Sequence, residues 1–191
     1  MKHIQISGSA RTTGKKADVK SVRRDEKVPC VFYGQGIENI NFSVEAKDLK
    51  LITDTPYAYI VDLTIDGKSY MAKLQDVQYH PVNDNAIHAD FLAVSEDKPV
   101  TIAVPIKITG NSEGVKQGGK LAVQVRKLKV CGLAANIPDE LPVDITTLQI
   151  GKRIIAADLN YDNIQIVSPK ATIVCQVKST RAAVEATAAA E

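Results

Sequence analysis

The stretch YIVDLTIDGKSYMAKLQDVQY, residues 59–79, decides the fold class of this chain. Every second residue from Tyr59 to Ile65 is apolar, which is the period-2 pattern of a β-strand with one buried face. Asp66-Gly67 follows, and this dipeptide is typical of the two-residue turn of a β-hairpin. The residues from Lys68 to about Tyr79 are therefore expected to return as the second strand. The stretch predicts antiparallel β-structure.

Short strand patterns continue on both sides of this hairpin. Further strands are expected around residues 4–6, 28–33, 42–44, 88–94, 100–108, 143–144, 153–156, 164–167 and 172–178. Helix is expected only over residues 17–24, with one helical turn over residues 46–52. The chain is therefore predicted to be mainly β, with little helix.

A polar segment that ends in proline, Ser95–Pro99, separates two sets of strand patterns. We place a domain boundary there, which gives a first domain over residues 1–94 and a second β-rich domain over residues 95–179. Residues 180–191 are rich in alanine and lack an apolar stripe, so they are expected to form a disordered tail.

In the second domain, a glycine-rich segment over residues 110–119 follows the strand expected over residues 100–108. Residues 114–120 fit most of the pattern of a phosphate-binding loop, but Leu121 stands where Ser or Thr would bind magnesium, and a strand pattern follows instead of a helix. We expect a flexible hairpin loop. Apolar residues then occupy odd positions up to Val125 and even positions from Leu128, and this slip predicts a β-bulge near residues 126–127.

Charge is distributed unevenly along the chain. The whole chain carries a formal net charge of +2, yet residues 1–30 carry eight Lys or Arg and three acidic residues. Such an excess near one end suggests a polyanionic partner. The basic segment, residues 11–27, lacks strand periodicity and leads to Tyr33, which can stack on a base or a sugar. These features alone leave nucleic-acid binding and an ordinary solvated surface equally open.

Other features bear on compartment and chemistry. Cys30, Cys131 and Cys175 are far apart and none forms a CxxC pair, so small buried thiols are expected rather than a zinc site or disulfides. No apolar stretch reaches the length of a membrane helix and no secretory signal is seen, so a cytoplasmic protein without a membrane partner is expected. His88 and Asp90 share one face of a strand. A hydrolytic or metal site involving them is an alternative to a hydrogen-bonding role.

Several ordered motifs resemble one family. The segment from Arg11 to Gly34, the Asp66-Gly67 turn, residues 73–81 (KLQDVQYHP) and residues 88–91 (HADF) are similar to large-subunit ribosomal protein twenty-five of bacteria, a 5S rRNA-binding family. Beyond the junction, the glycine segment, Ile137-Pro138 and Val143-Asp144 resemble the second domain of its long form, often called Ctc or general stress protein.

The resemblance implies an N-terminal six-stranded β-barrel that binds 5S rRNA, followed by a second mainly β domain. It implies a non-catalytic, ribosome-associated protein of the 50S subunit that serves translation, contacts neighbouring ribosomal proteins, and uses no cofactor, metal or small-molecule substrate. The residues implied to contact RNA are Arg11, Lys15, Lys16, Lys20, Ser21, Arg23, Tyr33, Lys73, Gln75, His88 and Asp90.

Two further expectations concern this site. By strand alternation, Lys73 and Gln75 share one face while Gln78 and His80 share the other, so the second pair is expected to be structural unless a bulge intervenes. Asp90 is expected to accept from a base amino group or to orient His88, because a carboxylate repels phosphates. A stress-linked module that binds a protein partner away from the ribosome is the alternative function, and a His/Asp hydrolase is a more remote one.

Overall fold

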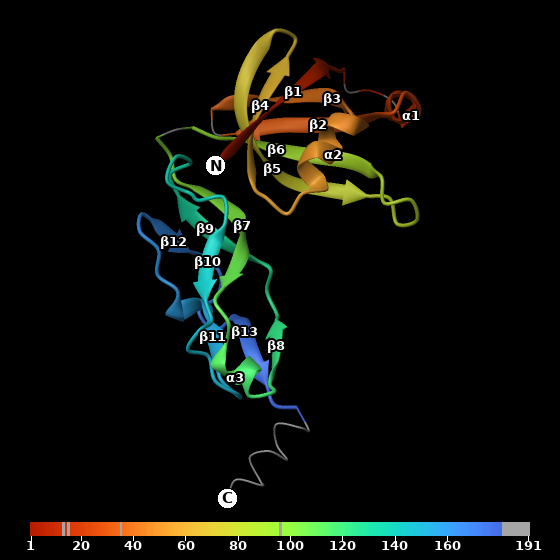
Figure 1. Ribbon diagram of the computed structural model, residues 1–191. Helices are drawn as coiled ribbons and strands as arrows, with labels where there is room; N and C mark the ends of the chain where they lie inside the picture. The colour runs from red at the N-terminus through yellow and green to blue at the C-terminus, as the bar shows by residue number, and fades with distance from the viewer. Residues whose placement is uncertain (13, 15, 35, 96, 181–191) are drawn as a thin grey trace, which may run out of the picture. The chain divides into compact units, whose positions relative to one another are not determined.

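The computed structural model describes residues 1–12, 14, 16–34, 36–95 and 97–180 (Figure 1). The chain divides into two compact units, Met1–Lys98 and a second unit that begins at Pro99. Both units are built mainly from strands, as the sequence predicts. None of the described helices is long and apolar enough to cross a membrane. The tail expected over residues 180–191 lies outside the described residues from position 181 onwards.

The first unit is a closed barrel with the strand order β1-β3-β2-β6-β5-β4, which confirms the expected six-stranded barrel (Figure 1). Two parallel pairings, β1 with β4 and β2 with β6, connect its antiparallel segments. The elements are β1 Lys2–Ala10, α1 Lys16–Arg24, β2 Lys27–Gly34, β3 Ile37–Glu45, α2 Ala46–Thr53, β4 Tyr59–Ile65, β5 Lys68–Tyr79 and β6 Ala86–Ala93.

Aromatic residues fill the interior of the barrel. Phe32, Phe42 and Phe91 are fully buried, and the rings of Phe42 and Phe91 have centroids 5.7 Å apart. Leu49 and Ile52 of α2 belong to the same core, so the helix predicted over residues 46–52 packs its apolar side against the strands. Burial of each such side chain contributes about 1.5–3 kcal/mol.

The hairpin predicted from residues 59–79 is confirmed. Ile65 pairs with Lys68, and the turn residues Asp66 and Gly67 both have positive φ, 47° and 82°. Positive φ at both central positions is the requirement of a type I′ turn, whose twist matches that of the flanking strands. This turn fixes the register of β4 against β5.

The strand β5 contains a β-bulge that strand alternation alone does not predict. Leu74 pairs with Phe91, but the next paired residue is Asp76, opposite Asp90. Gln75 is therefore the extra residue of the bulge. Because one residue is inserted, the apolar residue that faces the core is Leu74 before the bulge and Val77 after it.

The second unit contains a four-stranded sheet in the order β10-β7-β9-β12 and a three-stranded sheet in the order β11-β13-β8. Its elements are β7 Val100–Thr109, α3 Glu113–Lys116, β8 Lys120–Val123, β9 Lys127–Gly132, β10 Leu141–Asp144, β11 Arg153–Ile155, the 3-10 turn η1 Ala156–Asp158, β12 Ile164–Ile166 and β13 Ile173–Lys178. The strands predicted at residues 143–144, 153–156, 164–167 and 172–178 are confirmed.

The predicted β-bulge near residues 126–127 is wrong. β8 pairs with β13, whereas β9 pairs with β7 and β12. The chain thus leaves one sheet after Val123 and enters the other at Lys127. The slip in apolar periodicity marks this change of sheet, because the buried side differs between the two sheets.

The prediction of a hairpin loop over residues 110–119 is also wrong. A hairpin loop joins two paired strands, but β7 belongs to the four-stranded sheet and β8 to the three-stranded sheet. The segment instead forms α3, and the buried hydroxyl of Ser112 donates to the carbonyl of Leu148. Gly114 packs so closely that an added Cβ would lie 2.6 Å from the amide nitrogen of Ile150. β8 begins at Lys120, where a phosphate-binding loop would begin a helix.

Candidate RNA-binding site

The outer surface of β2, β6 and β5 carries five of the eleven residues that the resemblance implies, namely Tyr33, Lys73, Gln75, His88 and Asp90. Across these three strands, Tyr33 lies beside Leu92 and Leu92 beside Lys73. In the next row, Val31 lies beside Asp90 and Asp90 beside Asp76; in the following row, His88 lies beside Gln78. We call this surface the candidate face. The residues between these rows, such as Ala89 and Phe91, point into the core.

The bulge in β5 determines which side chains reach this face. Gln75 is exposed at the bulge, and the shift in alternation brings Gln78 directly opposite His88. Gln78 therefore joins the face, and it is a residue that strand alternation had assigned to the opposite side. The sequence signal for this position is the spacing of the apolar residues Leu74 and Val77. They lie three residues apart, whereas residues on one face of a regular strand lie two or four apart. His80 is structural, because its Nδ1 accepts from the amides of Val82 and Asn83 at 3.2 and 3.3 Å.

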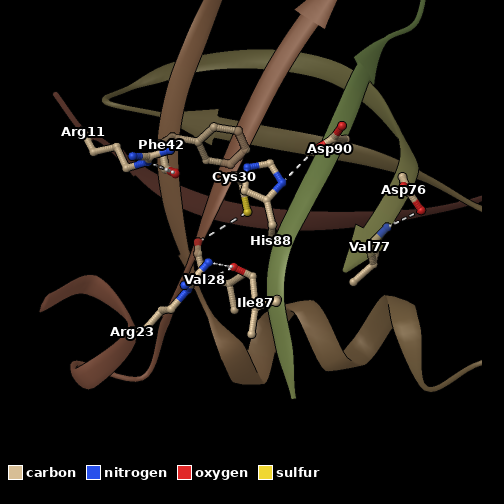
Figure 2. Close-up of polar contacts among 10 residues, drawn as sticks. All are labelled: Arg11, Arg23, Val28, Cys30, Phe42, Asp76, Val77, Ile87, His88 and Asp90. Atoms are coloured by element: carbon tan, nitrogen blue, oxygen red, sulfur yellow. Dashed lines mark hydrogen bonds and ion pairs between the residues drawn. The ribbon is translucent and has the colours of Figure 1, made fainter. Parts of the chain in front are cut away.

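Charged groups meet at the centre of the candidate face. Nδ1 of His88 lies 2.9 Å from Oδ1 of Asp90 (Figure 2), and their side chains are 24% and 34% exposed. The two atoms are within ion-pair distance, but Nδ1 has no partner with hydrogen-bond geometry among the described residues. Oδ1 of Asp76 accepts from the amide of Val77 at 2.9 Å. The face thus offers carboxylate oxygens and an imidazole that is held close to one of them.

The helix α1 borders this face and carries its cations. Arg23 donates from Nε and Nη2 to the carbonyl of Ile87, at 3.2 and 2.9 Å, and so fastens the helix beside His88 (Figure 2). The helix lies against β2, but none of its residues 16–24 is buried. Lys16, Lys20 and Ser21 are exposed. The helix predicted over residues 17–24 is confirmed, whereas Lys15 lies outside the described residues.

Arg11 and Lys73 differ from the other candidates in their surroundings. Arg11 follows β1, and its Nε donates to the carbonyl of Phe42 at 3.3 Å (Figure 2). Its amide donates to the carbonyl of Asn41 at 2.9 Å. Since Asn41 pairs with Val31, Arg11 lies at the β3 edge of the candidate face. Lys73 points outward between Leu92 and Ile60 but is only 8% exposed.

Cys30 lies in the core directly beneath this face. Burial raises the pKa of its thiol to about 12, so it stays a neutral, unreactive group at physiological pH. Cys30 and Cys175 are fully buried free thiols, as predicted, and Cys131 is half-buried. Among the described residues, no three His, Cys, Asp or Glu side chains are arranged to hold a metal ion.

The arrangement combines a cationic border with a centre that holds both donors and acceptors. Cations on α1 can contact phosphates, and the centre can form hydrogen bonds with base edges and 2′-hydroxyls. Asp76 and Asp90 lie directly opposite each other, and like charges in this position destabilise a sheet. A partner that donates hydrogen bonds would offset this repulsion.

Comparison with known proteins identifies both units. Residues 6–91 match the model of the Ribosomal L25p family, and residues 99–181 match that of the C-terminal domain of ribosomal protein TL5. The chain is 44% identical over 195 residues to the large ribosomal subunit protein bL25 of Bacteroides thetaiotaomicron, covering 100% of this chain and 99% of that protein. It is 46% identical over 197 residues to the bL25 of Phocaeicola vulgatus, with the same coverage. The bL25 of Porphyromonas gingivalis is 41% identical over 184 residues, 96% of each chain.

Proposed function

Because this chain belongs to the ribosomal L25p family, we propose that it is a structural constituent of the large ribosomal subunit and binds 5S rRNA through the candidate face. The observation that carries the proposal is the pairing of His88 with Gln78 and of Asp90 with Asp76 in adjacent rows of β6 and β5. Arg23 holds the cationic helix α1 beside these rows through its hydrogen bond to Ile87. The RNA-binding domain is residues 1–94, and residues 95–179 form a second domain. In this role the protein is located on cytoplasmic ribosomes.

Phosphate contacts supply most of the affinity. Lys16 and Lys20 are exposed on α1, beside the face. Each phosphate that such a side chain neutralises releases condensed counterions, so that affinity falls as salt rises. Arg23 uses two donors on Ile87 and retains others for the RNA, because a guanidinium has five. It acts mainly as a positioning residue that sets the distance between the cations and the face.

The centre of the face supplies shape and base recognition. Two carboxylates repel phosphates, so the RNA is placed with a groove over the centre and its backbone over α1. In A-form RNA the wide minor groove displays 2′-hydroxyls and base edges. The carboxylate of Asp90 can accept from a base amino group or a 2′-hydroxyl, and the amides of Gln75 and Gln78 can both donate and accept.

The proposal includes no catalytic step, cofactor or small-molecule substrate. The family is one of ribosomal structural proteins. Cys30 pairs with Ala89, between His88 and Asp90, but its thiol faces the core and burial raises its pKa, so it is not available as a nucleophile. His88 is therefore proposed to bind RNA rather than to act as a general base.

The barrel provides a matched control for the test. His88 and Asp90 lie on the candidate face, and a similar pair, His3 Nδ1 and Asp62 Oδ2 at 3.2 Å, lies on the surface of β1 and β4. His88→Ala in the full chain should weaken binding to 5S rRNA about tenfold, the effect of one lost base or sugar contact of about 1–3 kcal/mol. His3→Ala should leave binding unchanged.

Binding is measured by filter retention and by chemical footprinting of 5S rRNA, with circular dichroism as the check of folding. The proposal is refuted if His88→Ala, still folded, binds and protects 5S rRNA as the unaltered chain does. Equal losses in both variants would also refute it, because the contact would then not be specific to the candidate face.

A further inference from the structure

The three-stranded sheet of the second unit carries a cationic side chain on each strand. Lys120 of β8 pairs directly with Lys178 of β13, and Arg153 of β11 pairs with Gln176 of β13. β11, β13 and β8 lie side by side in that order (Figure 1). We call the surface formed by Arg153, Gln176, Lys178, Lys120 and Ala122 the basic face.

Alternation shows that these side chains point to one side of the sheet, away from its core. Cys175 pairs with Val123 and Val177 with Leu121. Cys175 and Val177 are buried in a hydrophobic cluster to which Leu121 also packs. The intervening pairs, Gln176 with Ala122 and Lys178 with Lys120, therefore point outward, because successive residues of a strand alternate between faces. Lys120, Lys178 and Arg153 are all exposed.

The positive charge of this face is not neutralised within the described part of the chain. No carboxylate of those residues forms an ion pair with Arg153, Lys120 or Lys178. By contrast, Lys107 on the other sheet lies 2.9 Å from Glu140. Two directly opposed lysines destabilise a strand pair, so the local fold alone gives no reason for their pairing.

The acidic residues on neighbouring elements do not cancel this charge. Oδ2 of Asp158, just after β11, accepts from the amide of Ile155 at 3.0 Å and so interacts with the backbone. Glu113 lies in the first turn of α3 and is exposed, and Lys116 in the last turn of α3 balances its charge. The segment before β11 adds another exposed cation, Lys152, whose carbonyl accepts from Val177.

We propose that the basic face binds the phosphate backbone of RNA, as a second contact independent of the candidate face. Adjacent strands lie about 4.8 Å apart, so cations on three strands extend over roughly 10 Å, which suits an extended polyanion better than an isolated phosphate. Gln176 lies among the cations and can donate to a phosphate oxygen or a 2′-hydroxyl. The guanidinium of Arg153 can donate two parallel hydrogen bonds to one phosphate.

The test compares two double variants of the full chain that lose the same charge. Lys120→Gln with Lys178→Gln removes the opposed pair. Lys127→Gln with Lys129→Gln removes two exposed lysines that share one face of β9 on the other sheet. Binding to a fluorescent single-stranded RNA of 20 nucleotides and mixed sequence is measured between about 50 and 300 mM salt. Each phosphate contact to a single strand contributes about 0.7 to the slope of log affinity against log salt.

We expect the Lys120/Lys178 variant to lose about 1.4 from this slope and to bind roughly tenfold more weakly at 100 mM salt, while the Lys127/Lys129 variant changes little. Bound RNA should also protect Lys120 and Lys178 of the unaltered chain from acetylation, measured by mass spectrometry. Melting should show that both variants fold, with the first no less stable because it loses a repulsion.

Three results would overturn the proposal. The first is an equal loss of slope in both double variants, which would mean that only total charge matters. The second is unchanged acetylation of Lys120 and Lys178 in the presence of RNA. The third is binding of polyglutamate as tight as that of RNA, with the same dependence on the two lysines, which would assign the face to an acidic protein. The proposed binding of 5S rRNA is tested separately, because His88→Ala changes neither lysine.

Discussion

Replacing Arg23 with alanine should weaken the docking of α1 on the barrel without unfolding the barrel. The two hydrogen bonds from its guanidinium to Ile87 are the described polar contacts between this helix and β6. Hydrogen bonds of charged donors contribute about 1.5–3 kcal/mol, and the exposure of Arg23 reduces this to about 1 kcal/mol. None of residues 16–24 is buried, so the free energy of global unfolding should change much less than that of local opening.

A loss of about 1 kcal/mol lowers the ratio of docked to undocked helix roughly fivefold. Hydrogen exchange followed by mass spectrometry should therefore show amides of α1 exchanging about five times faster, with the exchange of β2 and β6 unchanged. Affinity for 5S rRNA should fall as well, because the cations of α1 are held beside the candidate face in a smaller fraction of the molecules.

Arg24→Ala is the matched control, since it removes the same charge from the same last turn of α1. If Arg24→Ala accelerates exchange in α1 as much as Arg23→Ala does, helix electrostatics rather than the contact with Ile87 holds the helix, and the reasoning is refuted. Arg23→Lys should resemble Arg23→Ala in exchange, because an ammonium lacks the planar fork that reaches one carbonyl with two donors.

Three further predictions concern stability and reactivity. Gly114→Ala should destabilise the second unit by about 1–3 kcal/mol in urea denaturation, because the new Cβ would lie 2.6 Å from the Ile150 nitrogen; an unchanged midpoint would contradict this close packing. Cys30 should react with a thiol reagent at pH 8 only on unfolding, since a pKa of about 12 leaves roughly one thiolate in ten thousand. Hydrogen bonds from the Thr146 hydroxyl and amide lower the pKa of Asp144, so their stabilisation is present above the unfolded pKa and is lost as pH falls through the folded one. Thr146→Val should therefore destabilise the protein at pH 7 more than at pH 3, and an equal effect at both would exclude this linkage.

The barrel could be predicted from the sequence to the extent that its apolar residues alternate. Asp66-Gly67 fixes one hairpin, and the strands around it follow the period-2 pattern of a half-buried sheet. The prediction that the strands close into a barrel came from the resemblance of residues 11–34 and 73–91 to a known family. The apolar periodicity predicts strands but does not show which strands pair. The helix predicted before Val28 was also recognisable, because its charges lack strand alternation.

The features that could not be predicted from the sequence are those that depend on pairing between strands far apart in the chain. The change of sheet between Val123 and Lys127 gives the same slip in periodicity as a β-bulge, and only the partners β13 and β7 distinguish the two. Strand alternation continued from Lys73 through Gln75 misses the real bulge, at Gln75, although the apolar residues Leu74 and Val77 lie an odd number of positions apart. For this reason Gln78 was assigned to the wrong side of β5, whereas His88 and Asp90 were placed together correctly.

The closed barrel has a consequence for the protein before it meets RNA. Among the described strands, every strand of the barrel has a neighbour on both sides, whereas β8, β10, β11 and β12 of the second unit each leave one edge unpaired. Open edges can recruit another chain and begin aggregation, and lysine on an edge strand opposes this. Newly made copies that await a ribosome are thus exposed to self-association through the second unit, and Lys120 on β8 would also serve as a gatekeeper against it.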